Sequence, residues 1–356
     1  MQIKVSQCVI PRKTPFVTSQ ARQDAVNAVV VQIEDNGYTG IGETCPRPHI
    51  NGETLESSFN QAVTWAQSVE VGDSITPFFF DPGYTQLGAS TAMGIESALF
   101  DLRARQIGVP LHHLMNDQQR DRVSYAGFIG ANVKGRKLKR RLGRYAAYDC
   151  VRMKLSGNLA EDFERINMFR ETLPNVGLWV DVNQAWDETV YDRASELDGV
   201  YMIEQPFPVG RESLNNKLRD YAPVMLDESV QSLEDMHEHK HHMDAVNLKL
   251  LKLGHYSAVH ESVMQASEAG LQTYCGGTTM TDVAAAYARH LEFAVPNLDF
   301  FTTGKPRSSV LKEPISGSLG YSTEPLALSP QGVGLGVELY EDALARCTTE
   351  YFVRKL

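Results

Sequence analysis

The strongest constraint on the fold is a regular alternation of short apolar runs and helical stretches across the middle of the 356-residue chain. Helical periodicity fills the intervals, for example over residues 160–172, 257–269 and 281–290. This alternation predicts an α/β fold with a parallel sheet covered by helices, and about eight such units favour closure into a barrel. The runs that we interpret as strands are 123–129, 149–155, 178–182, 200–204, 223–226, 244–249, 271–275 and 297–301.

The regions on either side of this alternation have a different pattern. Strand-like residues 28–33 and 38–41 are joined by Asn36-Gly37, a hairpin turn signal. A helix is predicted over 91–107, because Gly108 with Pro110 behind it is a typical stop signal. The tail returns to loop and strand character and is expected to pack on the first region. The predicted organisation is 1–115, 116–305 and 306–356.

Composition narrows the possible partners. The formal net charge of -10 argues against nucleic acid or an anionic membrane. Five scattered cysteines without CxxC spacing argue against a disulfide framework or a zinc site and favour a reducing compartment. The first residues resemble a strand and contain no apolar run of signal-peptide length. We expect a cytoplasmic protein, and a large barrel of this kind is expected to form a homo-oligomer.

Two charged segments have competing interpretations. The basic run 134–144 resembles a nucleic-acid patch, but we favour the solvated face of a barrel helix because no aromatic residues interleave with it. The cluster His237, His239, His241 and His242 could bind a transition metal. We favour an exposed surface position, because the cluster falls between two strands on the helix side of the barrel.

Charged residues recur where the predicted strands end. Three carboxylates on neighbouring strands would repel one another unless a cation lies between them, and hard oxygen donors suit Mg²⁺, with Mn²⁺ as an alternative. A substrate carboxylate on such an ion would have its charge offset while an α-proton is lost. Five successive strands deliver Lys154, Asp181, Glu204, Asp227 and Lys249 to the same rim.

The two lysines flank the carboxylates and are candidates for acid/base catalysis. A lysine acts as a base only if its pKa falls, and burial or nearby positive charge, such as Arg152, would lower it. Asn183 and Glu228 are expected to support the ligands rather than to be ligands. Lys252 competes with Lys249 for the role of strand-end lysine, but we expect it past the strand, in the loop before Gly254.

These motifs, in this order and spacing, resemble the muconate-lactonizing subgroup of the enolase superfamily over nearly the whole chain. The residues that carry the resemblance are Arg152-Met153-Lys154, Asp181 in VDVN, Glu204 in IEQP, Asp227 in LDES, Lys249 in NLK, the helix IESALFDL with GVPL behind it, and Gly40-Ile41-Gly42-Glu43.

The resemblance implies a modified (β/α)₇β barrel under an α+β N-terminal capping domain that the C-terminal segment completes. It also implies metal ligands Asp181, Glu204 and Asp227 and acid/base residues Lys154 and Lys249. Specificity would come from loops 15–20 and 46–51 and from the ends of strands seven and eight. Substrate-binding candidates at those ends are Cys275, Gly276, Thr303 and Lys305, although a packed core thiol and a plain turn remain alternatives for the first two.

Two departures from the family pattern matter. The subgroup usually has Lys-x-Lys where this chain has Arg152-x-Lys154, and an arginine stays protonated, so it supports charge but is no second base. The dipeptide epimerases of the subgroup carry Asp-x-Asp after strand eight, whereas residues 302–307 contain no acid. A free dipeptide is therefore disfavoured, and Lys305 or Arg307 is expected to face a second substrate carboxylate.

The sequence leaves three functions open. The first is a racemase or epimerase of a carboxylic acid or amino acid derivative that uses Lys154 and Lys249 on opposite faces. The second is a cycloisomerase, or a lyase of the acid dehydratase type, that uses the same enolate. The third is a barrel that binds a small-molecule ligand without catalysis.

Overall fold

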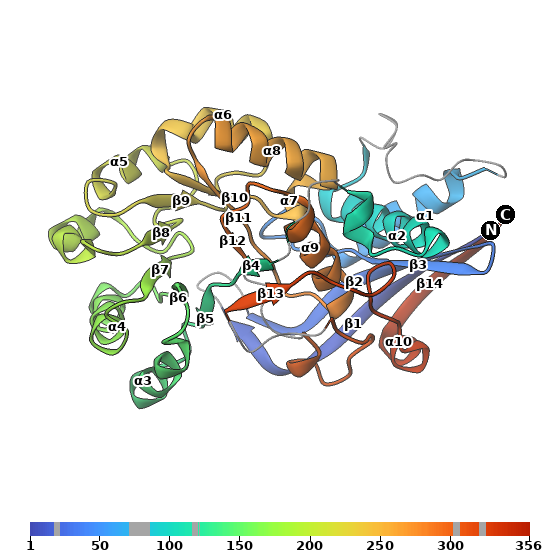
Figure 1. Ribbon diagram of the computed structural model, residues 1–356, viewed down its shortest axis with the longest axis horizontal. Coiled ribbons are helices and arrows are strands. Elements are labelled where there is room, and N and C mark those ends of the chain that lie inside the picture. Colours follow the sequence, from blue (N-terminus) through green and yellow to red (C-terminus); the bar gives the residue numbers. More distant parts are fainter. Residues whose placement is uncertain (18–21, 71–85, 116–119, 121, 302–306, 320–324) are drawn as a thin grey trace.

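The computed structural model of the protein describes residues 1–17, 22–70, 86–115, 120, 122–301, 307–319 and 325–356. An antiparallel sheet with two helices on it lies beside a curled parallel sheet that carries its own helices on the outside (Figure 1). None of the helices in the described ranges is long and apolar enough to cross a bilayer.

The parallel sheet is the predicted modified barrel. Its neighbouring strands are parallel along the order β12-β11-β10-β9-β8-β7-β6-β5. The sheet follows a curve rather than lying flat (Figure 1), so the strand ends point into one central region. The strands are β5 (Gly127–Ile129), β6 (Cys150–Lys154), β7 (Gly177–Asp181), β8 (Met202–Glu204), β9 (Val224–Leu226), β10 (Ala245–Asn247), β11 (Gln272–Cys275) and β12 (Phe300–Phe301).

A helical segment follows each barrel strand except the last, as a (β/α)₇β fold requires. In α4, Asn158 caps the first turn, and Phe163, Ile166 and Phe169 recur at helical spacing and are buried. The third connection is a 3₁₀ helix. The segments are α3 (Gly135–Leu142) with η3 (Gly143–Tyr145), α4 (Leu159–Thr172), η4 (Glu188–Leu197), η5 (Glu212–Leu214) with α5 (Asn215–Leu218), α6 (Leu233–His239) with η6 (Lys240–His242), α7 (Leu250–Leu253) with α8 (Tyr256–Glu268), and α9 (Asp282–Ala294).

The prediction of a single strand over 123–129 was wrong. The segment forms two short strands, β4 (Arg122–Ser124) and β5, and only β5 joins the barrel sheet. β4 pairs antiparallel with β13 (Leu326–Leu328), and the Tyr125 amide donates to the Pro325 carbonyl at 2.8 Å. The tail therefore takes the hydrogen bonds of this segment, and the chain enters the barrel only after Tyr125.

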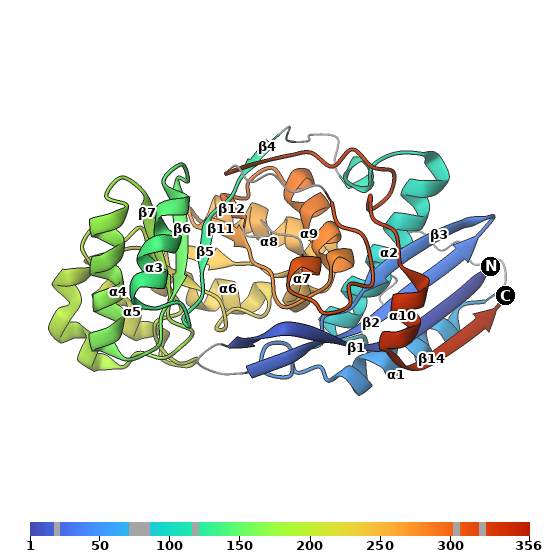
Figure 2. The ribbon, with the colours of Figure 1, turned by 90° about the horizontal axis from the view of Figure 1, so that it is seen from below.

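The antiparallel sheet joins the two ends of the chain in the order β14-β1-β2-β3. Its outermost pair is seen in Figure 2, where β14 runs beside β1 at the edge and the chain ends lie together. The predicted hairpin is confirmed, with Asn36 and Gly37 both at positive φ. The elements are β1 (Gln2–Val17), β2 (Arg22–Asp35), β3 (Tyr38–Glu43), α1 (Leu55–Ser68), α2 (Ala89–Ile107), η2 (Leu111–Leu114), η7 (Arg307–Ser309), α10 (Glu341–Cys347) and β14 (Thr348–Lys355).

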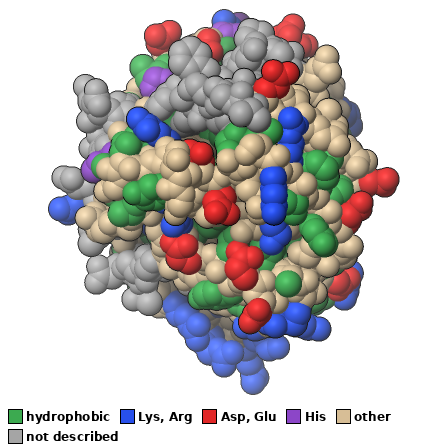
Figure 3. Space-filling view, turned by 90° about the vertical axis from the view of Figure 1, so that its right-hand side faces the viewer, with side chains coloured by type: hydrophobic (Ala, Val, Ile, Leu, Met, Phe, Trp, Pro, Cys, Tyr) green, Lys and Arg blue, Asp and Glu red, His purple; other side chains and the backbone are tan. Residues whose placement is uncertain are grey.

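Helix α2 packs on this sheet at very short range and ends at Gly108, as predicted, in the left-handed conformation. A Cβ on Gly42 of β3 would lie 2.0 Å from the Gly94 carbonyl oxygen of α2. Only glycine allows this approach, which fixes the height of the helix above the sheet. On the face seen in Figure 3, acidic side chains are scattered, several basic ones gather at the lower edge, and hydrophobic ones form only small groups.

The two ambiguous charged segments lie on the helix layer. In α3 the buried side chains are Leu138 and Leu142 and most of the cations are exposed, so the basic run is a solvated helix face apart from Arg141, which is half-buried and lines a cavity described below. The histidine cluster falls on α6 and η6, where His237 and His242 bond to the amide side chains of Gln265 and Asn216. No histidine in this cluster takes part in a metal-binding group among the described residues.

Candidate active site

The sheet register brings the five strand-end residues to one rim. Lys154 lies opposite Asp181, and Asp181 lies opposite Glu204 in the parallel ladder. Asp227 follows β9 directly, and Lys249 lies two residues after β10. All five side chains are buried although all are ionisable, which is uncommon outside functional sites.

Arg152 lies between the first two carboxylates. Its Nη2 donates to Asp181 Oδ2 at 2.5 Å and to Glu204 Oε1 at 2.7 Å, and its Nε donates to Glu204 Oε2 at 2.7 Å. The guanidinium carbon also lies 5.3 Å from the Trp179 ring centroid and 5.8 Å from that of Tyr274. Charge-assisted hydrogen bonds and aromatic faces together hold this arginine more firmly than a lysine could be held.

Lys154 and Asn183 form the next part of the network. Lys154 Nζ donates to Asp181 Oδ2 at 2.7 Å and to Asn183 Oδ1 at 2.5 Å. Asn183 in turn donates from Nδ2 to Glu228 Oε1 at 3.1 Å. The backbone of Asn183 has a φ of 48°, so the chain turns sharply after the strand and aims the amide back at the site.

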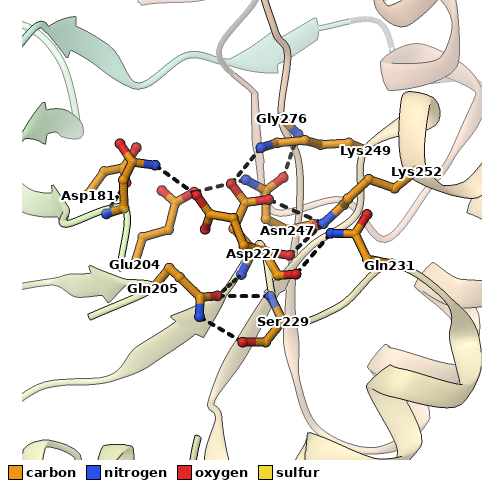
Figure 4. A network of polar contacts seen from close by, with 12 residues as sticks. Asp181, Glu204, Gln205, Asp227, Ser229, Gln231, Asn247, Lys249, Lys252 and Gly276 are labelled. Atoms are coloured by element: carbon orange, nitrogen blue, oxygen red, sulfur yellow. Dashed lines mark hydrogen bonds and ion pairs between the residues drawn. The ribbon is translucent and has the colours of Figure 1, made fainter. Parts of the chain in front are cut away.

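Lys249 and Lys252 both reach Asp227 (Figure 4). Lys249 Nζ donates to Asp227 Oδ2 at 2.5 Å. Lys252 Nζ donates to Asp227 Oδ1 at 3.2 Å, to the Asp227 carbonyl at 2.8 Å and to the Asn247 carbonyl at 2.7 Å. The expectation that Lys252 lies in a loop was wrong: it belongs to the one-turn helix α7, which directs it beneath Asp227.

Two amide side chains that the sequence analysis did not single out also hold the carboxylate row (Figure 4). Asn247 donates from Nδ2 to Glu204 Oε1 at 2.9 Å and accepts from the Gly276 amide at 2.9 Å. Gln205 Oε1 accepts from the Asp227 amide at 2.9 Å. The sequence did contain a signal for both residues, because Gln205 lies in the IEQP motif and Asn247 in the NLK motif. A polar side chain at the end of a fully buried strand needs a hydrogen-bond partner.

Burial and mutual repulsion set the protonation of the carboxylates. Burial, opposed by Arg152 and reinforced by Asp181 and Asp227, raises the pKa of Glu204 to about 8. Burial and then Asp227 raise the pKa of Glu228 to about 7. Although burial disfavours their charged forms, nearby cations hold the pKa values of Asp181 and Asp227 below the ordinary range.

The expectation of a lowered lysine pKa does not hold for Lys249 in this arrangement. Burial lowers its pKa, but Asp227, Glu228 and Glu204 outweigh that effect and raise the pKa of Lys249 above its usual value. A cation that neutralised these carboxylates would remove the cause of the increase.

The donor chemistry of the site fits a hard divalent cation. Oxygen atoms dominate it, and Glu228 Oε2 is a buried carboxylate oxygen with no hydrogen-bond partner. Among the residues that the structure describes, however, no three acidic, histidine or cysteine side chains converge as metal ligands. Cationic side chains hold the carboxylate oxygens instead, so a metal ion would enter only if some of these cations moved off them. They are Arg152, Lys154, Lys249 and Lys252.

A cavity of about 310 Å³ opens above the network. Its floor carries Lys154, Asn183, Asp227, Glu228 and Lys249. Its walls include aromatic and aliphatic side chains. Three arginines add positive charge to the walls, and the sequence had indicated only one of them, Arg307, as a substrate contact. These wall residues are Phe16, Ile50, Phe128, Tyr145, Tyr148, Met280, Arg12, Arg141 and Arg307.

The predicted specificity segments are only partly described. Loop 46–51 contributes His49 and Ile50 to the cavity, and loop 15–20 contributes Phe16, while residues 18–20 lie outside the described ranges. Thr303 and Lys305 also lie outside them.

Cys275 belongs to the core and does not line the cavity; burial raises the pKa of its thiol to about 12. Gly276 lies behind Lys249, where a Cβ would be 3.0 Å from the Cε atom of that lysine.

Comparison with known families agrees with this geometry. Residues 136–343 match the model described as enolase C-terminal domain-like, and residues 1–116 match the mandelate racemase/muconate lactonizing enzyme N-terminal domain. The chain belongs to the enolase superfamily. The predicted family and fold class are therefore confirmed.

Several relatives of this enolase-superfamily protein align over most of its length. An N-succinyl-L-Arg/Lys racemase from Bacillus cereus is 25% identical, with 95% of each chain covered. Muconate cycloisomerase 1 from Rhodococcus opacus is 30% identical, with 88% of each chain covered. A solved dipeptide epimerase from Cytophaga hutchinsonii, complexed with Mg and the dipeptide D-Ala-L-Val, superposes with a TM-score of 0.85 at 21% identity, covering 100% of this chain and 99% of that one. These relatives are isomerases, so the general reaction type predicted for the family is supported.

Proposed function

We propose that the protein is a Mg²⁺-dependent racemase or epimerase that removes the proton next to a substrate carboxylate. The observation that carries the proposal is the placement of two buried lysines at the two ends of one carboxylate row. Lys154 contacts Asp181 at one end and Lys249 contacts Asp227 at the other. Both lysines line the floor of the same cavity.

Asp181, Glu204 and Asp227 are the residues that would hold the metal. When bound, Mg²⁺ would offset the negative charge that builds up on the substrate carboxylate as the α-proton leaves. Lys252 and Asn247 would keep Asp227 and Glu204 in position through their hydrogen bonds. The aromatic and aliphatic wall would exclude water and protect the acidic carbon from exchange with solvent.

The two lysines would divide the proton transfer between them. One amine would remove the α-proton and the other, as an ammonium, would return a proton on the opposite face, which inverts the carbon. Asn183 would orient Lys154 through its Oδ1 atom. Arg152 stays protonated and would support the developing charge without taking part as a base.

The substrate would be an acylated amino acid or a related acid rather than a free amino acid or dipeptide. Arg12, Arg141 and Arg307 line the cavity, and their charge would repel a free ammonium group. The name of the Bacillus cereus relative specifies an N-succinyl amino acid, which agrees with a substrate whose amine is blocked.

Deuterium incorporation tests the proposal directly. Both enantiomers of a set of N-acyl amino acids would be incubated in D₂O with Mg²⁺, and α-deuteration and inversion would be followed by mass spectrometry and chiral separation. The wild type is expected to label and invert both enantiomers. Lys154→Met and Lys249→Met should each abolish inversion, and each should retain exchange with one enantiomer only.

Two controls separate the alternatives. Lys137→Met removes an exposed lysine on α3 and should behave as the wild type. Ring closure of a muconate without α-deuteration of any N-acyl amino acid would favour a cycloisomerase, which the 30% identical relative makes the second candidate. Calorimetry that detects no Mg²⁺ binding to the wild type, compared with Asp181→Asn, would contradict metal-dependent catalysis and favour a ligand-binding barrel.

A further inference from the structure

Among the described residues, the cavity-lining arginines Arg12, Arg141 and Arg307 have no anionic partner, and two of them, Arg12 and Arg307, lie on one wall. Arg12 donates from Nε to the Thr14 carbonyl at 3.2 Å, and its guanidinium carbon lies 5.6 Å from the Phe16 ring centroid. Arg307 Nε is buried without a hydrogen-bond partner. Within the described ranges, neither arginine forms an ion pair. Charged groups withdrawn from water are normally paired, so a guanidinium pair left unpaired in a cavity indicates a missing anion.

Backbone pairing fixes the two arginines on the same wall, although they are far apart in sequence. Arg12 forms an antiparallel bridge with Leu311, and the Lys13 amide donates to the Val310 carbonyl at 2.9 Å. Arg307 opens the short helix η7, whose first amide donates to Asp282 Oδ1 at 2.9 Å. Asp282 belongs to barrel helix α9, so the barrel holds one arginine and the capping strand holds the other.

The arginine pair lies near the reacting centre but not on it. A Cβ on Gly277 would lie 3.3 Å from Nη2 of Arg307, and a Cβ on Gly276 would lie 3.0 Å from Cε of Lys249. The two glycines are consecutive and both side chains line the same cavity, so a single small substrate in the cavity would contact Lys249 and Arg307 together.

The wall is also electrostatically positive. Burial lowers the pKa of Arg12, and the charges of Arg307 and Arg47 lower it further. Arg47 is itself buried and makes its hydrogen bonds to neutral groups, including the Thr279 hydroxyl at 3.0 Å and the Asn27 carbonyl at 3.0 Å. On the floor of the cavity Lys154 and Lys249 form ion pairs with acids, whereas the arginines of the wall do not within the described ranges, so the unpaired positive charge lies on the wall.

We propose that Arg12 and Arg307 bind a second carboxylate of the substrate, which makes the substrate a dicarboxylate. This inference rests on the proposed function, because the first carboxylate is the one beside the reacting carbon. Guanidinium groups pair with carboxylates through two parallel hydrogen bonds, so two arginines select for a carboxylate over an amide as well as over an apolar tail.

Matched pairs of compounds test the inference. N-succinylglycine differs from N-butyrylglycine by one terminal carboxylate, and N-acetylglutamate differs from N-acetylglutamine by its side-chain acid. α-Deuteration in D₂O with Mg²⁺ and calorimetric dissociation constants would be measured for all four. In at least one pair the wild type should prefer the acid by about 10- to 100-fold, the effect expected of one or two charge-assisted hydrogen bonds.

Arginine variants test whether Arg12 and Arg307 cause the preference for the acid over its neutral analogue. The double variant Arg12→Gln with Arg307→Gln should lose the preference through a higher KM for the acid, while its melting temperature stays close to the wild-type value. Lys13→Gln removes one positive charge from the adjacent, exposed position on β1 and should keep the preference.

The outcomes separate this inference from the proposed function. Exchange with both members of each pair at equal rates would overturn the dicarboxylate inference and leave the proposed function standing. Tighter binding of an acid that depends on the two arginines, without exchange of any compound, would support the subsite and contradict the proposed function. A preference that persists in the double variant, or no discrimination in binding, would overturn the subsite.

Discussion

Lys252 is expected to hold the site together, and its removal gives the most quantitative test of the network. Its side chain is only 1% exposed and donates to two carbonyls and to the Asp227 carboxylate. Lys252→Met keeps most of the volume and removes the charge. The variant leaves the buried Asp227 carboxylate with one cation fewer and removes one hydrogen bond from each of the Asp227 and Asn247 carbonyls, of which the former keeps its bond from the Val230 amide.

The size of the effect follows from these contacts. Breaking a buried ion pair by removing one partner costs about 3–5 kcal/mol. The entropy of unfolding is roughly 2.1 cal/mol/K per residue, which for 356 residues is about 0.75 kcal/mol/K. The melting temperature of Lys252→Met should therefore fall by roughly 4–7 °C.

Differential scanning calorimetry in metal-free buffer would measure this shift, with Lys137→Met, an exposed lysine on α3, as the matched control. The control should melt within about 1 °C of the wild type, as surface substitutions usually do. If Lys252→Met also melted within that margin, the reasoning that Lys252 neutralises and supports Asp227 would be refuted.

Three further predictions test other contacts. In Gly276→Ala the new Cβ would lie 2.6 Å from Oδ1 of Asn247, so one of the two groups would have to move. We expect turnover in the exchange assay to fall about 100-fold and the melting temperature in calorimetry to change little. Burial and its histidine neighbour lower the pKa of His290 to about 3. Between about pH 6.5 and pH 3 the histidine is protonated in the unfolded chain but neutral in the folded protein. The free energy of unfolding therefore falls as the pH drops through this range. His290→Asn should remove about 2 kcal/mol of the stability difference between pH 7 and pH 5 in urea titrations, and an unchanged difference would contradict this. Gly42→Ala should lose about 3 kcal/mol of unfolding free energy, because of its contact with α2, whereas Gly143→Ala, with nothing within 4 Å, should not.

The strand ends of the barrel were predictable from the sequence for a definite reason. A parallel sheet places all the carboxyl ends of its strands on one rim, so spacing by one βα unit is enough to collect Asp181, Glu204 and Asp227. Strong apolar runs also located most strands within two residues. The most informative exception was the run before Gly127, where backbone pairing with the tail divided one apparent strand into two.

The position of Lys252 was not predictable, because a single helical turn leaves no periodic signal. α7 spans only Leu250–Leu253, too short for a hydrophobic pattern to appear. The raised pKa of Lys249 was not predictable either. It depends on how many carboxylates surround one amine, and that number becomes known only when the folded positions are known.

The pairing of Arg12 with Arg307 could not be predicted from the sequence, for another reason. Arg307 was anticipated as a contact to a second carboxylate, and it does line the cavity. Arg12 was not, because its neighbour on the wall comes from the opposite end of the chain through the Leu311 bridge. Sequence patterns report local periodicity, and they carry little information about pairing over such separations.

The pairing of β14 with β1 has a consequence for how the protein is made. Thr348–Lys355 leaves the ribosome after every other strand described here, yet it covers one edge of β1. Until β14 is synthesised, the amides and carbonyls along one edge of β1 are unpaired, and the sheet of the capping domain is incomplete. We expect the newly synthesised chain to depend on chaperones, or on slow translation, until its last strand is in place.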